Sequence, residues 1–146
     1  MLAPSKRYDR LKDVFAYLVS DEARAKYKWV MVDSLTEIGQ LLIEKLQVKY
    51  PDRKDALVMW GEYSNELRSM IKAFRDLRGF NVIFTALSIP EKDENGRRYM
   101  GVMLQGKISE QLPGYFDEVF FYTSVEDSEG VTRRVLVTQA TDKLPA

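Results

Sequence analysis

The feature that most restricts the possible fold of this chain is an apolar run of strand length that ends at an acid. Residues 29–32 read Trp-Val-Met-Val, and Asp33 and Ser34 follow directly. A buried strand that ends in an acid places the carboxylate at the carboxyl end of a sheet, where open α/β folds bind ligands. A carboxylate at that edge can hold Mg²⁺ directly or through water. The same residues also fit a core strand whose Asp33 only caps the next helix, and both interpretations stay open here.

The amino-acid composition restricts the kinds of catalytic, metal-binding and nucleic-acid-binding site that this chain can have. The chain has 146 residues, which is the size of one domain with a proper core. It contains neither cysteine nor histidine, which excludes disulfides, thiolate zinc sites, cysteine nucleophiles and Ser-His-Asp triads. Its 22 basic and 22 acidic residues cancel, so any nucleic-acid binding must be local. No apolar run reaches membrane-spanning length and no signal-peptide core is visible, so we expect a cytoplasmic protein.

Apolar spacing predicts helices on both sides of this strand. A helix is expected over about 6–19, followed by a short turn at Ser20, and another after Asp33 that stops before Pro51. A long helix carries a wide apolar stripe from Trp60 onward and ends at Gly79. Residues 81–87 read as a second fully buried strand. The order strand, helix, helix, strand implies parallel pairing through a right-handed crossover.

The last third of the sequence has a different pattern. Residues 91–98 form a charged loop with an Asn-Gly turn, which is typical of a hairpin or a mobile loop. Residues 116–125 and 134–138 are expected to be strands, joined by the polar turn 126–130. They should pair as an antiparallel hairpin at one side of the sheet.

Several of these motifs, in this order, resemble the RecA-like ATPases of phages, nucleotide-binding proteins related to single-strand annealing and recombination. The resemblance rests on 32–36, on 81–86 and on the segments 106–108 and 116–119, and it covers about residues 27–146. It implies an α/β fold with a RecA-like P-loop NTPase core: a mainly parallel sheet flanked by helices, with a C-terminal antiparallel hairpin. It further implies ATP and Mg²⁺ as cofactors, single-stranded DNA as a partner, and a homo-oligomer in a bacterial or phage-infected host.

One part of the family pattern is missing. Members start with a strand and a phosphate loop, Gly-x-x-x-x-Gly-Lys-Ser/Thr, whose backbone amides cradle the phosphates. No such loop precedes Asp33. The near match at 101–108 follows the acid, has an apolar interior and puts Ile108 where a hydroxyl should ligate Mg²⁺, so a strand ending in Gly-Lys is our interpretation. We therefore expect residues 1–146 to be a single partial RecA-like domain, incomplete at the N-terminus, that does not bind ATP tightly alone.

The resemblance assigns roles to individual residues. Asp33 becomes the Walker B acid that holds Mg²⁺, and Ser34 and Thr36 help to order water around it. Thr85 ends the second strand, where the family places a polar residue that senses the γ-phosphate. A threonine chosen for its β propensity would look the same. Glu37 is interpreted as a surface acid in the first turn of a helix.

A cationic and aromatic group follows the second strand. Arg97, Arg98, Tyr99 and Lys107 occupy the position of the DNA-contacting loops of RecA-like proteins. Cations beside an aromatic ring suit single-stranded nucleic acid through phosphate contacts and base stacking. The alternative is an ordinary solvated hairpin tip, because three acids share the loop. Nearer the C-terminus, Arg133 and Arg134 could reach a neighbouring subunit's nucleotide, or could simply protect an edge strand.

The sequence thus predicts the C-terminal part of a phage RecA-like ATP-binding protein that acts in single-stranded DNA recombination or replication. Hydrolysis of ATP with Mg²⁺ is the activity of that family. The alternative is a non-catalytic structural or interaction domain with a degenerate nucleotidase fold.

Overall fold

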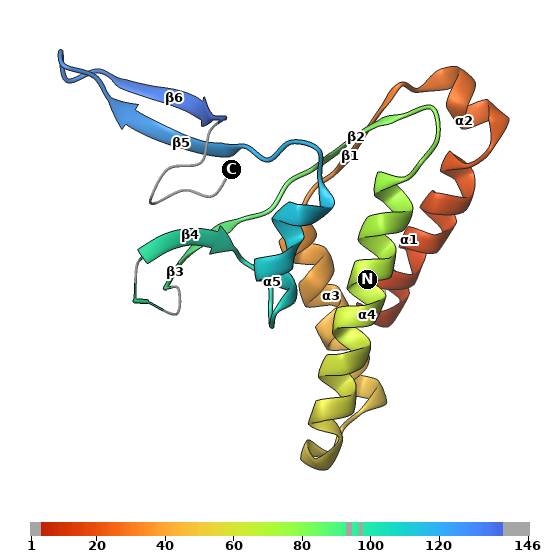
Figure 1. Ribbon diagram of the computed structural model, residues 1–146. Coiled ribbons are helices and arrows are strands. Elements are labelled where there is room, and N and C mark those ends of the chain that lie inside the picture. Colours follow the sequence, from red (N-terminus) through yellow and green to blue (C-terminus); the bar gives the residue numbers. More distant parts are fainter. Residues whose placement is uncertain (1–3, 93–94, 97, 139–146) are drawn as a thin grey trace. The chain divides into compact units, whose positions relative to one another are not determined.

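The computed structural model describes residues 4–92, 95–96 and 98–138 (Figure 1). The α-helices are α1 (Pro4–Leu18), α2 (Asp21–Lys26), α3 (Leu35–Lys49), α4 (Ala56–Arg75) and α5 (Ile108–Gln111). Two 3₁₀ helices are η1 (Arg53–Asp55) and η2 (Leu112–Tyr115). The strands are β1 (Trp29–Val32), β2 (Asn81–Phe84), β3 (Ser88–Lys92), β4 (Arg98–Val102), β5 (Phe121–Glu126) and β6 (Thr132–Val137).

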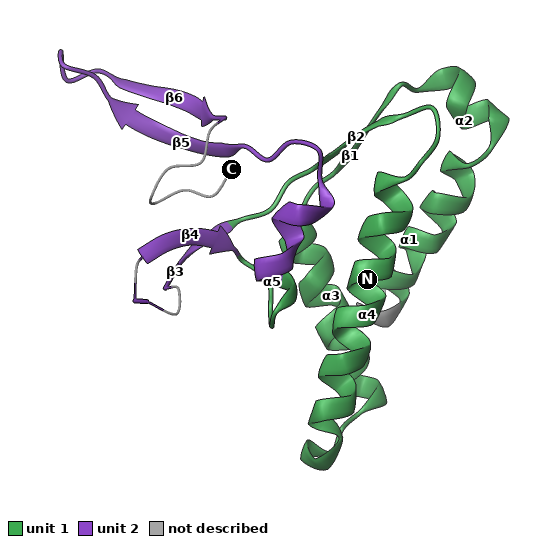
Figure 2. Cartoon of the chain, viewed as in Figure 1, with its two compact units in different colours: residues 1–87, 103–108 green, residues 88–102, 109–146 purple. Residues whose placement is uncertain are grey.

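These elements divide into two compact units, each described here by itself (Figure 2). The first unit comprises residues 1–87 and 103–108, and the second comprises residues 88–102 and 109–146. The first unit therefore holds α1 to α4 with β1 and β2, and the second holds the four remaining strands.

Helices α1, α3 and α4 form the core of the first unit. α1 packs on α3 and α3 on α4, and the rings of Phe15 and Phe74 lie 5.4 Å apart between α1 and α4. The predicted helices are confirmed, and α3 ends at Lys49 just before Pro51. The predicted end of the long helix at Gly79 is wrong, because α4 ends at Arg75. The large side chains of α3 and α4 that are almost fully buried are Leu35, Leu42, Leu46, Tyr63, Leu67 and Ile71. Their recurrence at helical spacing is why these segments are helices, since each must bury one stripe.

The parallel pair of β1 and β2 is confirmed, with Val32 opposite Phe84. The expected burial of β2 is wrong, because only one face of the pair is covered. Val32 is buried, but Trp29 and Met31 are 64% and 63% exposed and Ile83 is 40% exposed. A contiguous apolar run indicates a strand buried on both faces. Here the alternate side chains Trp29, Met31 and Ile83 leave the other face of the pair uncovered within the described residues.

The second unit is made of two antiparallel pairs. β3 pairs with β4, and β5 pairs with β6, with Phe121 opposite Val137. The predicted C-terminal hairpin is confirmed, although β5 begins at Phe121 and not at residue 116, and the hairpin is a two-stranded sheet of its own, not hydrogen-bonded to the parallel pair. The described strands therefore make one parallel and two antiparallel two-stranded sheets. The fold is mixed α/β with small sheets, in place of the mainly parallel sheet that the sequence predicts.

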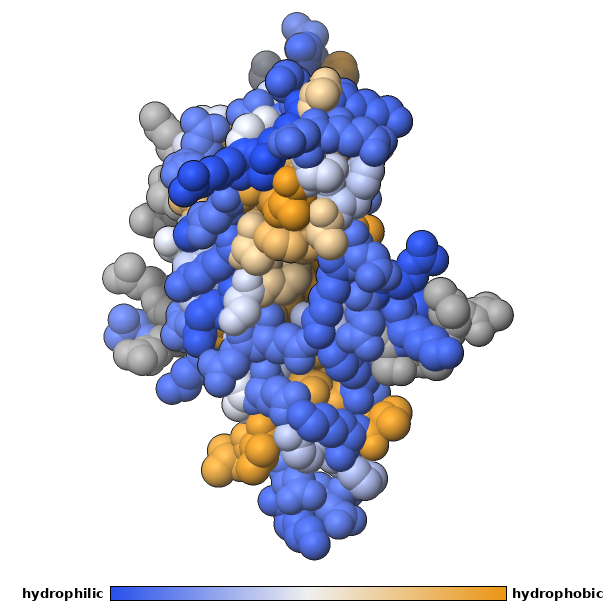
Figure 3. All heavy atoms as spheres, turned by 90° about the vertical axis from the view of Figure 1, so that its right-hand side faces the viewer, coloured by the Kyte–Doolittle hydropathy of each residue, from blue (hydrophilic) through white to orange (hydrophobic). Residues whose placement is uncertain are grey.

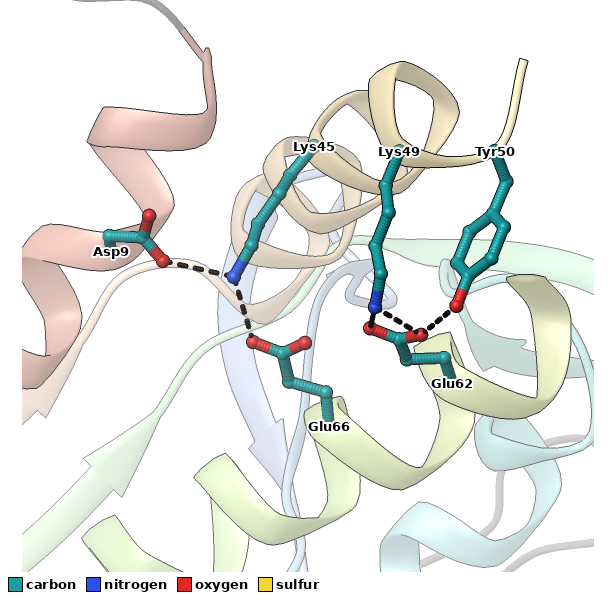
Figure 4. A network of polar contacts seen from close by, with 6 residues as sticks. All are labelled: Asp9, Lys45, Lys49, Tyr50, Glu62 and Glu66. Atoms are coloured by element: carbon teal, nitrogen blue, oxygen red, sulfur yellow. Dashed lines mark hydrogen bonds and ion pairs between the residues drawn. The ribbon is translucent and has the colours of Figure 1, made fainter. Parts of the chain in front are cut away.

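Two groups of polar side chains tie α1, α3 and α4 together (Figure 4). The Lys45 ammonium lies 2.9 Å from Asp9 Oδ1 on α1 and 3.1 Å from Glu66 Oε1 on α4. Burial alone would lower the pKa of Lys45, but its hydrogen bonds to Asp9 and Glu66 outweigh that effect and raise it. Lys45 thus remains charged and bridges three helices.

The second group joins the end of α3 to α4. Lys49 Nζ lies 2.6 Å from Glu62 Oε1, and the Tyr50 hydroxyl donates to Glu62 Oε2 at 2.6 Å. Hydrogen bonds from Lys49 and Tyr50 hold the pKa of Glu62 below its ordinary value. The folded state therefore favours the ionised form of Glu62.

Glu62→Gln should make the stability of this protein less dependent on pH in the acidic range. A carboxyl whose folded-state pKa is lowered contributes stability above its unfolded pKa and loses it as pH falls through the lowered value. The variant should therefore melt below the parent near neutral pH, and the gap should close in acid as the pH falls through the lowered pKa of Glu62 and the carboxyl becomes protonated in the parent. Thermal unfolding followed by circular dichroism measures both curves. A gap that stays constant over this pH range would contradict the assignment.

Among the described residues, no helix has the length and apolar character needed to cross a membrane.

Candidate functional site

Asp33 and Thr85 lie together at the carboxyl ends of the two parallel strands. The Thr85 hydroxyl donates a hydrogen bond to Asp33 Oδ1. The backbone continues the pairing, because the Thr85 amide donates to the Val32 carbonyl at 3.0 Å and the Leu35 amide to the Thr85 carbonyl at 2.8 Å. The peptide bond between Asp33 and Ser34 is cis. Two residues 52 positions apart in the sequence thus form one polar pair at the sheet edge.

The role of helix cap falls to Ser34, not to Asp33. Ser34 precedes α3 with extended backbone, and its Oγ accepts a hydrogen bond from the Glu37 amide at 3.3 Å. This is ordinary N-cap geometry, which satisfies one of the free amides of the first turn. The alternative in which Asp33 only caps the helix is therefore wrong. The Asp33 carboxylate is exposed, and Glu37 is an exposed acid in the first turn of α3, as predicted.

Thr36 has a structural contact that sequence reasoning missed. Its Oγ1 accepts a hydrogen bond from the Leu87 amide at 3.0 Å. Together with the bond between Leu35 and Thr85, this contact fastens the chain after β2 to the first turn of α3. The water-ordering role of Thr36 stays a prediction, and its oxygen also fixes the segment that carries Thr85. Only a Ser or Thr at a helix start, next to a strand end, could have signalled such a contact.

The site fits Mg²⁺ only when phosphate supplies most of the ligands. No group of three or more acids that could hold a metal occurs in the part of the chain that the structure describes. Mg²⁺ demands octahedral oxygen ligands and in nucleotide sites takes one or two carboxylates together with phosphate oxygens and water. Asp33 offers one exposed carboxylate whose Oδ1 is oriented by Thr85. This donor set matches a metal that is carried by a nucleotide, and not a free Mg²⁺ ion.

The near match to a phosphate loop at 101–108 is not a phosphate cradle. Gly101 lies in β4 opposite Ile89, and the carboxylate of Glu91 fills the space where a Cβ would stand. An acid against that glycine repels phosphate. Gly106 has φ 75°, in the left-handed region that favours glycine, and the helix after it, α5, has only four residues. The segment is therefore a strand followed by a turn, close to the interpretation from sequence.

The described members of the predicted nucleic-acid group divide between the two units. Arg97 lies outside the described residues. Arg98 and Tyr99 are in β4, in the second unit, and the Tyr99 hydroxyl donates to Glu91 Oε2 at 2.7 Å. Lys107 belongs to the first unit and is exposed. Tyr99 is thus paired across the hairpin with an acid, which favours a structural role for its hydroxyl.

The two arginines near the C-terminal end also differ in their surroundings. Arg133 Nε lies 2.9 Å from Asp127 Oδ2 in the turn between β5 and β6. The Val131 amide first, and then Arg133 and the Glu129 amide, hold the pKa of Asp127 below its ordinary value. Arg134 lies opposite Ser124 in the hairpin. Arg133 is therefore part of a closed turn, and Arg134 alone of the two is placed on the strand surface without a described ion pair.

Comparison with known proteins bears on the family. The family model of the AAA domain matches residues 3–146. Neither the comparison with curated proteins nor that with solved structures gave a match. The matched segment takes in the parallel pair, the acid that ends it and both hairpins. The chain therefore belongs to the AAA domain family, a family of the P-loop NTPase type.

Proposed function

We propose that this chain supplies the Walker B side of an ATP-binding site in a RecA-like ATPase. The observation that carries the proposal is the pair of Asp33 and Thr85 at the carboxyl ends of neighbouring parallel strands. In open α/β sheets that edge is where ligands bind. AAA domains generally bind ATP with Mg²⁺, so the ligand class agrees with the family.

Each residue of the pair has a distinct task. Asp33 would hold the metal of Mg·ATP, directly or through water, and Thr85 orients that carboxylate and would sense the γ-phosphate. When bound, the metal would supply the positive charge that neutralises the phosphates. Ser34 caps α3 and contacts water beside the metal through its remaining hydrogen-bonding capacity. Thr36 and Leu35 keep Thr85 in place through their bonds to the chain after β2.

The finer proposal concerns the biological setting. We infer a phage protein that acts on single-stranded DNA in recombination or replication, with the nucleotide bound between subunits of a homo-oligomer. Its support is the order of motifs: a strand ending in Asp33, a neighbouring strand ending in Thr85, a hairpin with cations, and a last hairpin. Arg98 and Lys107 are the described cations that serve DNA in this proposal, and both are exposed.

A second function is favoured by one specific observation. The carboxylate of Glu91 occupies the space beside Gly101, so the chain's own Gly-Lys segment offers no cradle for phosphate. A non-catalytic interaction domain would keep Asp33 and Thr85 merely as a link between two strands. Binding of nucleotide at that pair separates the two functions.

Mn·ATP should identify the site in the chain as it stands. Mn²⁺ replaces Mg²⁺ and broadens the NMR signals of nearby nuclei, so even weak, millimolar binding becomes visible. We expect the amide signals of Asp33, Ser34 and Thr85 to broaden with Mn·ATP more than with Mn²⁺ alone, because the phosphates supply most of the metal ligands.

Asp33→Asn is the matched control, because an amide keeps the shape of the carboxylate and loses its charge. Selective broadening should disappear in that variant. Equal broadening in parent and variant, or none at these three residues in the parent, would favour the non-catalytic domain.

A further inference from the structure

A cleft on the first unit lies between α4 and the loop of residues 103–107. It has a volume of about 250 Å³ and is lined by Trp60, Ser64, Gln105 and Gly106. Trp60 and Ser64 are one helical turn apart on α4 and therefore share a face of the helix. All four residues belong to the first unit, so the cleft is formed within one compact body.

The loop that closes this cleft is held firmly against α3 and α4. The Met103 amide donates to the Leu87 carbonyl at 2.8 Å. Leu104 enters a notch at Gly39 of α3, where an added Cβ would stand 2.8 Å from Leu104 Cδ2 and 3.0 Å from the Tyr63 hydroxyl. Such distances leave no room for a side chain at Gly39. The positions of Gln105 and Gly106 opposite α4 therefore follow from packing.

The aromatic wall of the cleft is also fixed. The Trp60 ring meets the ring of Tyr63 edge to face, with centroids 5.6 Å apart and an interplanar angle of 85°. Tyr63 is 1% exposed, whereas Trp60 is 39% exposed. The buried tyrosine thus supports the indole from behind, and part of the indole stays open to solvent. A pre-oriented aromatic surface costs little entropy when a flat ligand stacks on it.

Two polar side chains, those of Ser64 and Gln105, line the cleft beside the indole. In the described part of the chain, the side chains of Ser64 and Gln105 make no hydrogen bond, and Lys107, the next residue but one, makes no ion pair. A carboxamide presents a donor and an acceptor side by side, which matches the edge of a nucleobase, and a hydroxyl serves either role. Unpaired bases are recognised in proteins by this combination of an aromatic platform and edge hydrogen bonds.

We propose that this cleft binds one nucleobase, stacked on Trp60 and contacted at its edge by Gln105 and Ser64, with Lys107 meeting its phosphate. The small volume suits a single base better than a larger ligand. The base belongs either to a free nucleotide or to an unpaired residue of a single strand, since both offer the same ring and phosphate. The inference goes beyond the proposed function and does not require Asp33 or a metal.

The two tryptophans of the chain make a direct test possible. Trp29→Phe leaves Trp60 as the single tryptophan, and its fluorescence should be quenched to saturation by thymidine monophosphate or by a short oligothymidylate, in EDTA. Stronger, salt-dependent binding of the oligonucleotide identifies a single strand as the source. Equal binding of both identifies a free nucleotide. Absence of saturable quenching by either ligand overturns the proposal.

Substitutions make the test specific to the cleft. With a labelled oligothymidylate, Trp60→Ala should weaken binding by about tenfold, within the range measured for loss of one stacking platform. Gln105→Ala should also weaken it, and Lys107→Ala should flatten the log–log salt slope by about 0.7, the value for one phosphate contact. Trp29→Ala is the control that should bind like the parent.

Unfolding does not explain a loss of binding in this series, because Gln105 and Lys107 are exposed and Trp60→Ala is checked by circular dichroism. If Trp60→Ala and Gln105→Ala both bind like the parent, the cleft does not hold a base. That failure leaves the Mn·ATP experiment untouched, since no metal is present here, and failure of the Mn·ATP experiment likewise leaves this one untouched.

Discussion

Asp33→Asn is expected to remove most Mg²⁺-dependent ATP turnover from a protein in which a strand and phosphate loop precede this chain. The amide keeps the shape of the carboxylate and still accepts a hydrogen bond from Thr85, but it lacks the charge that holds the metal. Loss of one preorganised electrostatic group costs at least about 100-fold in turnover. Nucleotide binding should stay mostly intact, because the phosphate loop supplies much of the affinity. Steady-state phosphate release and calorimetry measure the two quantities separately.

Ser34→Ala is the matched control for this prediction. It changes the neighbouring residue and removes the N-cap of α3, which costs about 1 kcal/mol of stability. Turnover per folded molecule should fall far less than in Asp33→Asn, because Ser34 contacts only water beside the metal and the metal-binding charge is still present. If the two variants hydrolyse ATP equally well, Asp33 does not belong to the metal site, and its bond to Thr85 is only a link between strands.

Local patterns in the sequence predict the helices, the parallel pair and the last hairpin well. α3 begins and ends where its cap and Pro51 place the boundaries, and both are short-range signals. The parallel pairing of β1 with β2 follows from the helices between them, because a parallel connection needs a crossover. The proximity of Asp33 and Thr85 then follows from register alone. This is why the pair could be predicted although 52 residues separate its members.

Contacts that depend on packing could not be predicted in the same way. The hydrogen bonds from the Leu87 amide to Thr36 Oγ1 and from the Tyr99 hydroxyl to Glu91 join groups whose positions only the folded chain defines. The exposure of Trp29 and Met31 could not be predicted for a related reason. An apolar run indicates that a strand can be buried, but it does not indicate which element covers it. No sequence pattern predicts the cleft at Trp60, because this residue belongs to the apolar stripe of α4, and such a stripe is typical of a helix face buried in the core.

The surface of the first unit shows how unevenly its apolar side chains are covered. Figure 3 shows a mainly hydrophilic face with apolar groups gathered in a few places. On α4 this contrast occurs within one helix, since Leu67 is fully buried and Leu57 is 85% exposed. Replacing each of these two leucines by alanine therefore makes the same chemical change at a buried and at an exposed position of one helix.

Leu67→Ala should lower the stability of the protein strongly. Removing a fully buried leucine loses its transfer free energy and leaves a cavity, which together cost about 2–5 kcal/mol. For a chain of this length, such a loss corresponds to a fall in Tm of roughly 5–20 °C. Thermal and urea unfolding followed by circular dichroism provide the measurement, and an unchanged slope of free energy against urea would show that stability, not compactness, has changed.

Leu57→Ala, on the same helix, carries the same loss of atoms at an exposed position. It should change the free energy of unfolding by no more than about 0.5 kcal/mol, as surface substitutions usually do. Helix propensity cannot produce the difference, because both sites lie in α4 and both change leucine to alanine. A large effect at Leu57 would show that this residue is covered in solution, by another molecule or another part of the protein. Equal, small effects at both positions would contradict the packing of α4 against α3 on which the Trp60 cleft depends.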